Sequence, residues 1–385
     1  MVGDVVPRVT DELARLSGRF TSRTRDTGLA ARLGIALGVA FGLCFLTGLV
    51  SHFMQHPLPW LPWPARPVWF YRVTQGVHVV TGTALVPLLL AKFWAVYPRL
   101  FTWPPFRSLA HAAERGFVLL LVVAALFQVS TGLANIASWY PFGFFFTTAH
   151  YAVAWLLAGA LVVHVAHKWR TTRDALRVPL RDPADASLSR RQFLTAAGVT
   201  SGLLVAVTAG QTVPALRPLG LLATRRSDVG PQGLPVNRSA VAAGVTELVH
   251  APDYRLRVTG AVDRELTLAL AGLRALPQVS ARLPITCVEG WSADATWTGI
   301  RLRELLDRAG AAPGARVRVA SLQRKGGYRE SYVDPPHARD PLTLLALRVN
   351  GEPLAADHGF PCRLIAPNRP GVLQTKWVTE VEVLP

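Results

Sequence analysis

The sequence predicts an all-α helical membrane bundle followed by a soluble α+β domain. Half of the 385 residues are hydrophobic, only 17% are charged, and the mean hydropathy is +0.28, which is too apolar for an ordinary soluble protein. The apolar residues are concentrated in the first 213 positions, whereas the remaining part is mixed and rich in arginine. A single soluble domain does not account for this asymmetry.

Five stretches satisfy the requirement of ~20 mostly apolar residues for a membrane-spanning helix. They run from Leu29 to Val50, Gly76 to Tyr97, Gly116 to Ala137, Thr147 to Trp169 and Phe193 to Val213, and the last is the least apolar. We therefore expect the following parts: a cytoplasmic tail (1–28), a four-helix membrane domain (29–169), a cytoplasmic basic loop (170–192), a fifth transmembrane helix (193–213), a linker (214–235) and an extracytoplasmic domain (236–385).

Basic residues predict the orientation of these helices. Arginines and lysines precede the first helix and join the second to the third and the fourth to the fifth, so these sides are cytoplasmic. The other two loops hold only Arg66 and Arg72 and are rich in aromatic residues, which is typical of the outer interface. Five crossings then place the C-terminal domain outside the cytoplasm. Because membrane topology explains most of the net charge of +17, we expect no nucleic-acid partner.

Histidines in the first four helices are candidate ligands of a b-type haem, because ionisable groups at membrane depth are costly and tend to be paired or ligating. His78 and His150 lie at the same outer depth on different helices, an arrangement that commonly holds such a haem. His52 or His56, at the outer end of the first helix, could replace His78. Capping of helix ends by these histidines stays open as the alternative to haem binding.

A second haem would need His164, which follows His150 by 14 residues and therefore lies on nearly the same helix face. The residue 14 positions after His78 is Lys92, so His164 lacks an obvious partner. We expect one haem b and leave the second open.

A twin-arginine export signal is indicated by the run Ser189-Arg190-Arg191-Gln192-Phe193-Leu194, which stands before a weakly apolar stretch. Paired arginines at a cytoplasmic helix end would also satisfy the positive-inside rule. The signal reading implies that the following domain folds around a cofactor before export by the twin-arginine machinery.

The soluble part contains alternating runs that predict strands, such as Tyr254 to Val258, Arg316 to Val319 and Trp377 to Val383, and an amphipathic helix from Arg301 to Ala309. Cys287 follows an apolar run, at the end of an expected strand. A soft thiolate suits a thiophilic metal, but a lone cysteine lacks the companions that zinc and iron–sulfur sites require. A metal that arrives bound to an organic dithiolene would need only this one thiolate. Cys44 and Cys362 are expected to be core packing.

Several motifs after Cys287 occur in one order over about 150 residues: Cys287-Val288-Glu289-Gly290-Trp291-Ser292, Trp297-Thr298-Gly299, Asn350-Gly351-Glu352-Pro353-Leu354, His358-Gly359-Phe360-Pro361, Arg363-Leu364-Ile365-Ala366-Pro367 and Lys376-Trp377. This set resembles the sulfite oxidase family of molybdopterin enzymes, and within it most closely the periplasmic methionine sulfoxide reductase catalytic subunits. The four-helix section separately resembles the b-type cytochrome subunits of membrane oxidoreductases.

The resemblance implies that Cys287 binds the molybdenum of Mo-molybdopterin and that Arg363 and Lys376 pair with the pterin phosphate. It implies further cofactor contacts from Asn237, Ser321, His358, Gln374 and Thr375. Tyr328 is a candidate catalytic residue at the mouth of the site, although an exposed aromatic in a turn is an equal interpretation. The reductases usually carry Asn at the position of His358 and Gly-Ile-Lys at Gln374-Thr375-Lys376, so the substrate stays open.

Together these features predict a membrane-anchored oxidoreductase that passes electrons between the quinone pool and a small S- or N-oxide or oxyanion substrate through haem b. We favour sulfoxide reduction, because only Arg282 closely precedes the Cys287 motif, whereas a sulfite dianion would favour several cations. Sulfite-type oxidation that delivers electrons to quinone is the first alternative. The second is a non-catalytic exported binding module on a cytochrome anchor. The oligomeric state stays open.

Overall fold

The computed structural model describes residues 25–98, 108–180, 189–209 and 214–385. Parts of the expected N-terminal tail, basic loop and fifth helix lie outside the described residues, as does the segment 99–107. The chain forms two compact units. The first contains Met1–Leu46 and Val77–Gly210, and the second contains Thr47–Gly76 and Gln211–Pro385.

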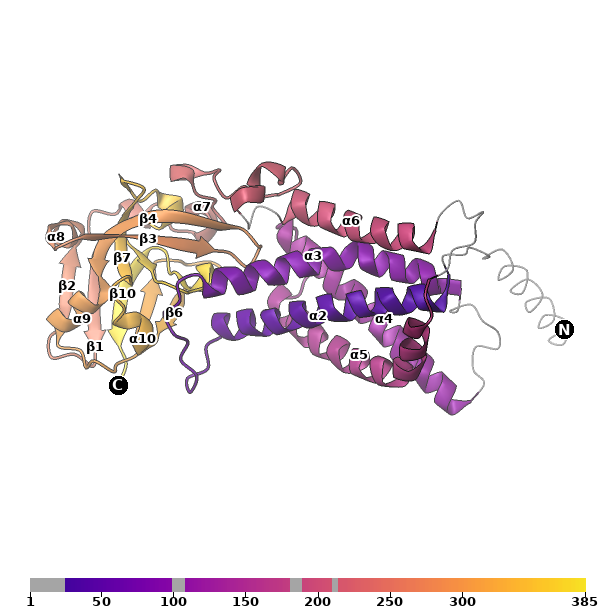
Figure 1. Cartoon of the computed structure of the whole chain (residues 1–385). Helices are drawn as coiled ribbons and strands as arrows, with labels where there is room; N and C mark the ends of the chain where they lie inside the picture. The colour runs from indigo at the N-terminus through magenta and orange to yellow at the C-terminus, as the bar shows by residue number, and fades with distance from the viewer. Residues whose placement is uncertain (1–24, 99–107, 181–188, 210–213) are drawn as a thin grey trace, which may run out of the picture. The chain divides into compact units, whose positions relative to one another are not determined.

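Four helices are long and apolar enough to cross a membrane, and these are the helices labelled α2 to α5 in Figure 1. Their bounds are α2 Thr27–Gln55, α3 Phe70–Val96, α4 Leu109–Ile136 and α5 Phe146–Arg177. Each is nearly uniformly apolar over at least 18 residues, as expected for helices surrounded by lipid. The predicted multi-pass membrane section is confirmed.

The helix after the basic loop is α6, Arg190–Thr208. It has 19 residues but is less apolar than the four membrane-crossing candidates, and it is not among them. Its N-terminus is a capping box, in which the Ser189 hydroxyl accepts from the Gln192 amide and the Gln192 side chain accepts from the Ser189 amide. Ala197 of α6 packs in a small core with Leu29, Leu33 and Ala91 of α2 and α3. Whether α6 spans the membrane stays a prediction.

The second unit is built on two sheets, and Figure 1 labels their strands. One has the order β2-β1-β10-β5-β6; only the β1–β10 pair in it is parallel. Its strands are β1 Arg255–Gly260, β2 Leu266–Ala269, β5 Val317–Ser321, β6 Glu330–Val333 and β10 Val378–Val383. The other has the antiparallel order β3-β4-β7-β8, with β9 also on β7. Its strands are β3 Val279–Thr286, β4 Ser292–Arg301, β7 Leu344–Val349, β8 Glu352–Pro353 and β9 Arg363–Ile365.

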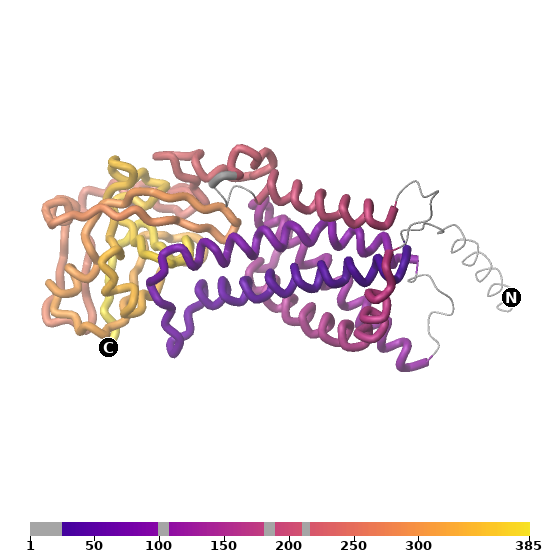
Figure 2. The backbone as a smooth tube through the Cα atoms, in the orientation of Figure 1, coloured from indigo at the N-terminus to yellow at the C-terminus, as the bar shows by residue number. Residues whose placement is uncertain are grey.

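Short helices precede β1 and fill connections between the later strands. They are η3 Pro214–Leu219, η4 Pro231–Gly233, α7 Ala240–Ala243, η5 Leu248–His250, α8 Leu270–Ala275, α9 Leu302–Ala309, α10 Pro335–Ala338, η6 Ala356–His358 and η7 Gly371–Leu373. The tube in Figure 2 follows the chain through them. The predicted strands at β1, β5 and β10 and the amphipathic helix at α9 are present, so the α+β fold class is confirmed.

Two hydrophobic cores hold the sheets. The larger one joins side chains from both sheets to the buried face of α9, which supplies Leu302, Leu305, Leu306 and Ala309 at helical spacing. The smaller one lies around β3, β4 and β7 and contains Cys287 and Trp291. Cys287 is therefore placed by a rigid part of the fold. Cys362 is fully buried in the larger core, where its neighbours are apolar.

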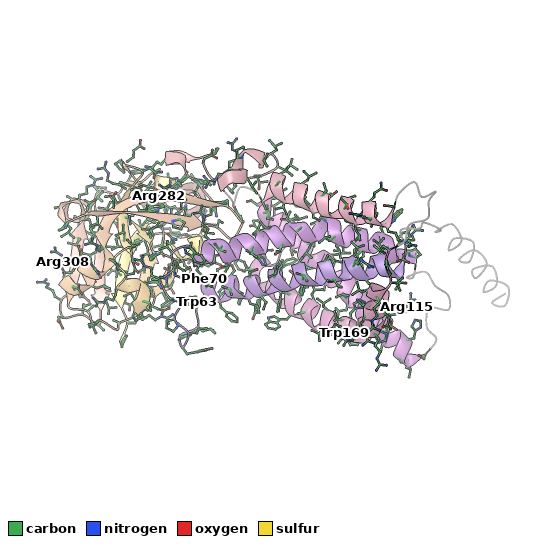
Figure 3. All side chains as sticks on the ribbon, viewed as in Figure 1. Trp63, Phe70, Arg115, Trp169, Arg282 and Arg308 are labelled. Atoms are coloured by element: carbon green, nitrogen blue, oxygen red, sulfur yellow. The ribbon has the colours of Figure 1, made fainter. Side chains whose placement is uncertain are left out.

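The second unit also includes the C-terminal end of α2, the start of α3 and the loop between them. Asn368 fixes this segment, because its side-chain amide donates to the Pro64 carbonyl and its oxygen accepts from the Tyr71 amide at 2.9 Å. Arg66 forms a two-point contact with Asp340 at 3.0 and 3.2 Å. Trp63 and Phe70, labelled in Figure 3, pack with ring centres 6.2 Å apart.

Candidate active site

Cys287 lies in a tight turn between β3 and β4. The turn is closed by two backbone hydrogen bonds, from the Cys287 amide to the Trp291 carbonyl at 3.0 Å and from the Gly290 amide to the Cys287 carbonyl at 3.1 Å. Gly290 has a φ of 97°, in the region that favours glycine. The thiol at this strand end is 3% exposed. The turn therefore holds one buried sulfur in a defined position.

Hydrogen-bond donors surround the sulfur. The Asn237 side-chain amide donates to Cys287 Sγ at 2.5 Å. The Glu289 backbone amide donates to the same sulfur at 3.4 Å. The Asn237 oxygen in turn accepts from the Trp291 indole at 3.1 Å, which fixes the orientation of the amide. These contacts treat the sulfur as an acceptor, the role it would have as a metal-bound thiolate.

Burial raises the pKa of Cys287 to about 12, and the Glu289 carboxylate acts in the same direction. The thiol therefore stays protonated at neutral pH unless a cation lies against it. A bound metal ion would supply that charge. Within the described residues, no group of three or more His, Cys, Asp and Glu side chains could hold a metal ion. The site thus fits a metal that brings its other ligands with it.

Arg363 on β9 is a buried cation, 2% exposed, and it forms no ion pair within the part of the chain that the structure describes. One terminal nitrogen donates to the His358 carbonyl at 3.1 Å, and the guanidinium lies 5.2 Å from the centre of the Trp297 ring. Its Nε is buried without a hydrogen-bond partner. Burial lowers the pKa of Arg363 to about 9. A guanidinium left in this state is poised to bind an anion.

Lys376 is a second cation near Arg363. Its ammonium group donates to the backbone carbonyls of Arg238 at 2.9 Å and Asp357 at 2.6 Å, so it is held without a carboxylate contact. Burial, reinforced by the positive charge of Arg363, lowers the pKa of Lys376 well below its usual range, and Cys287 also interacts electrostatically with it. Two such cations near one thiol fit a cofactor that carries both a phosphate and a metal.

A glycine makes room between these cations. Gly359 has a φ of 109°, and a Cβ there would lie 3.1 Å from the Lys376 Cβ and 3.2 Å from the Arg363 Cβ. Because both atoms are anchored close to the backbone, a larger residue would push the two side chains aside. The His358-Gly359 motif is therefore a requirement of how these cations pack.

The other predicted cofactor residues occupy two kinds of position. Ser321 donates to the Lys376 carbonyl at 2.7 Å, and His358 Nε2 donates to the Pro231 carbonyl at 2.7 Å, so both border the cation pair. Gln374 and Thr375 are buried beside Lys376. Gln374 donates to the Arg369 carbonyl at 3.1 Å and keeps a buried oxygen without a partner, whereas Thr375 bonds the Ser331 hydroxyl at 2.7 Å. Direct cofactor contact by each of these residues stays a proposal.

Tyr328 comes from the loop between β5 and β6 and is half-buried. Its φ of 59° is uncommon for a residue other than glycine, and such strain is often found at functional sites. Burial and the nearby Cys287 raise the pKa of Tyr328, so its phenol stays protonated at neutral pH. The electrostatic influence of Cys287 on Tyr328 is compatible with the expected place of this residue at the mouth of the site, and that place stays a prediction.

Three residues near the thiol were not expected from the sequence. Arg225 from the linker pairs with Glu289 at 3.0 Å. Tyr71 interacts electrostatically with Cys287 and Tyr328, and Gln75 donates to the Val288 carbonyl at 3.1 Å. Tyr71 and Gln75 belong to the start of α3, in a stretch that the sequence assigns to the outer loop, before the expected helix from Gly76 to Tyr97. Their residue types in a polar, aromatic loop give no sign of burial, so they were missed.

In the helical unit, His78 of α3 and His150 of α5 face each other with ring centres 6.3 Å apart. His78 Nδ1 donates to the Cys44 carbonyl at 2.8 Å. His150 Nδ1 bonds Thr131 Oγ1 at 3.0 Å, and that hydroxyl donates to the Phe127 carbonyl. Both rings are thus oriented through Nδ1 and keep Nε2 for a ligand.

The other candidate histidines are arranged differently. His52 and His56 pack against each other with ring centres 4.8 Å apart, and they belong to the second unit. Within the described helices, His164 has no ring contact with another histidine. The structure thus brings His78 to His150 and provides His164 with no imidazole partner.

Comparison with known families gives one match. Residues 242–385 match the family model described as the oxidoreductase molybdopterin binding domain.

Three curated relatives illustrate the likeness. The chain is 32% identical over 161 residues to mitochondrial sulfite oxidase of Drosophila melanogaster, an alignment that covers 35% of this chain and 28% of the relative. It is 35% identical over 130 residues to the putative protein-methionine-sulfoxide reductase subunit YedZ1 of Azospira oryzae, covering 34% and 48%. It is 30% identical over 223 residues to the protein-methionine-sulfoxide reductase catalytic subunit MsrP of Gluconobacter oxydans, covering 52% and 71%. The chain thus spans less than half the length of the first two relatives.

We predict that the stability of the cofactor-free chain falls as the pH drops from about 6.5 to about 4. Burial, with Arg363 nearby, lowers the pKa of His358 to about 4. The unfolded chain takes up a proton below 6.5, whereas the folded chain resists it until about pH 4, so acid favours unfolding by an amount on the order of 2–3 kcal/mol. Thermal unfolding in detergent at several pH values measures this.

His358→Asn should lose less stability over the same pH range, because asparagine does not titrate. His337, whose pKa burial also lowers to about 4, provides a second variant, His337→Asn, with the same expected direction. An unchanged pH slope in both variants would contradict the assignment.

Proposed function

Since the chain belongs to the family of molybdopterin-binding oxidoreductases that includes the protein-methionine-sulfoxide reductase catalytic subunit MsrP, we propose that it reduces a sulfoxide outside the cytoplasm, using electrons that membrane quinol supplies through a haem b. The observation that carries the proposal is the pairing of one buried thiol, Cys287, with two cations, the buried Arg363 and the partly exposed Lys376, neither of which forms an ion pair among the described residues.

These residues would hold the cofactor by complementary charge. Cys287 would provide the protein's ligand to the metal, and Asn237 would keep the sulfur oriented. Arg363 and Lys376 would bind the phosphate, with the guanidinium Nε and the ammonium group as donors. When bound, Mo-molybdopterin supplies the two-electron centre for oxygen-atom transfer.

The overall reaction consumes a sulfoxide, two electrons and two protons and releases a sulfide and water. Tyr328 is the residue suited to orient the substrate, because its phenol is protonated at neutral pH and lies near Cys287. A hydrogen bond from Tyr328 Oη to the sulfoxide oxygen would fix the substrate and place a proton where water forms.

The distribution of charge favours a neutral substrate over sulfite. Arg282 on β3 is exposed and lies at the surface in Figure 3, with its neighbour across the sheet at Thr296. Arg301 is engaged by Glu304 at 2.8 Å. Arg225, another cation near the thiol, is paired with Glu289 at 3.0 Å, and Arg363 and Lys376 would be occupied by the cofactor phosphate, which leaves few cations for a sulfite dianion. Sulfite oxidation is therefore the alternative outcome of the assay below.

A haem b between His78 and His150 would supply the electrons one at a time. Two imidazoles that ligate one metal ion from opposite sides, with a nitrogen–metal distance of ~2 Å each, have ring centres about 6 Å apart. The observed 6.3 Å supports this arrangement, as do the two Nδ1 hydrogen bonds that leave Nε2 available. One haem is proposed, since His164 has no imidazole partner in the described helices.

The proposed topology places the catalytic unit on the outer side of the cytoplasmic membrane. The asymmetry of basic residues between the loops supports it. Export of a domain already folded around its cofactor would use the twin-arginine machinery, which the run from Ser189 to Leu194 would address.

The direct test is sulfoxide reduction by the detergent-solubilised chain and by Cys287→Ser. We expect about one molybdenum per wild-type chain and turnover of dimethyl sulfoxide with a reduced quinol analogue. Cys287→Ser should lose at least about 10³-fold in kcat, because it removes the metal ligand. Cys362→Ser is the matched control, since this cysteine is also fully buried but lies away from the turn.

Faster turnover of sulfite than of any sulfoxide would replace the reductive direction with the oxidative one. Retention of full activity in Cys287→Ser would contradict the site. A wild-type chain that binds molybdopterin without turning over either substrate would leave a non-catalytic module.

We predict that His78→Ala and His150→Ala each abolish the reduced-minus-oxidised absorption signal of haem b, because loss of either ligand leaves a bis-imidazole site incomplete. His164→Ala and His52→Ala should retain the signal. The experiment compares haem per chain for all four variants by pyridine haemochrome absorption. Loss of haem in His52→Ala but not in His78→Ala would contradict the proposed pair.

A further inference from the structure

The start of α3 is bonded to the segment that carries Cys287. Arg72 Nη1 contacts both carboxylate oxygens of Asp294, at 2.9 and 3.1 Å, just after the turn, on β4. Val68 packs against the hydrophobic cluster that contains Cys287. The segment 47–76 and the turn belong to the same compact unit. The segment 47–76 lies outside residues 242–385, the part of the chain that the family model matches.

Gln75 makes the contact nearest to the thiol. Its side chain is 3% exposed, and Nε2 donates to the carbonyl of Val288, the residue after Cys287, at 3.1 Å. Its oxygen accepts from the Ser51 hydroxyl at 2.6 Å, and Ser51 accepts from Gln55 Nε2 at 2.9 Å. A buried amide with both ends bonded has one orientation, so Gln75 fixes the position of the Val288 peptide.

Tyr71 lies one helical turn before Gln75. Its ring is 1% exposed, its backbone amide is held by Asn368 at 2.9 Å, and its hydroxyl lies 3.5 Å from Ser51 Oγ. Tyr71 thus anchors the start of α3 in the unit that carries the Cys287 turn.

We propose that the first two turns of α3 are part of the catalytic site: Gln75 is a positioning residue that holds the Cys287 turn through the Val288 carbonyl. This inference rests on the proposed function. It assigns positioning to a residue that the molybdopterin-binding domain does not itself contain.

The physical argument is one of geometry. A displacement of ~1 Å in a reacting group costs on the order of 10²-fold in rate, and a turn that protrudes from a sheet depends on contacts from outside the sheet to avoid such displacement.

The experiment compares the cofactor-loaded full-length chain with Gln75→Met, which keeps the length of the side chain and removes both polar groups. Gln55→Met is the matched control, because Gln55 joins the same network through Ser51 on α2 and does not bond the turn. We expect Gln75→Met to retain molybdenum, to lower kcat for dimethyl sulfoxide about 10- to 100-fold, and to shift the Mo(V) electron paramagnetic resonance signal. Gln55→Met should leave both unchanged.

An active wild type with Gln75→Met indistinguishable from Gln55→Met in resonance signal and kcat would overturn the inference while the proposed function stands. An inactive wild type that holds molybdenum would instead count against the proposed function. In that case the resonance signal alone decides the positioning role of Gln75.

Discussion

The structure of the catalytic unit depends on an electrostatic constraint: the buried Arg363 and the partly exposed Lys376 lie near each other, and neither forms an ion pair with a carboxylate among the described residues. Removing two like charges from water costs several kcal/mol unless an anion compensates. The surrounding fold is arranged to tolerate them, with backbone carbonyls on Lys376, a tryptophan ring on Arg363 and a glycine between their Cβ atoms. An anion that binds here stabilises the folded chain by mass action, so cofactor binding and stability are linked.

The sulfur site has a complementary design. The Cys287 turn extends beyond its own sheet, and it is fixed by side chains from two separate segments: Asn237 and Arg225 on the approach to the domain, and Gln75 at the start of α3. The same α3 carries His78 three residues after Gln75. One helix therefore provides both a contact to the Cys287 turn and a candidate haem ligand. A chain in which these elements are fused can fix such contacts permanently, whereas separate subunits would have to form them on association.

The sequence was sufficient for features that depend on local pattern. Hydropathy predicted α2 to α5, alternation predicted β1, β5 and β10, and motif order placed Cys287, Arg363 and Lys376 in one domain. Equal depth predicted that His78 and His150 could meet. Tertiary contacts of the segment 47–76 could not be predicted, because Tyr71 and Gln75 lie by composition in the outer loop before the expected helix, and their contacts with Asn368 and Val288 join residues more than 200 positions apart. The bonding of Thr375 to Ser331 was likewise invisible in the sequence, since it depends on how β6 meets the chain before β10.

The account rests on the claim that the two cations bind the phosphate of Mo-molybdopterin, and the most direct test is the pterin and molybdenum content of Arg363→Met and Lys376→Met. Methionine keeps an unbranched apolar chain and removes the charge. The account predicts that each variant folds and loses at least about tenfold in cofactor occupancy, since each removes a charge-assisted contact of ~1.5–3 kcal/mol, while Arg282→Met at the exposed face of β3 keeps full occupancy. Full pterin and molybdenum content in both Arg363→Met and Lys376→Met would contradict it.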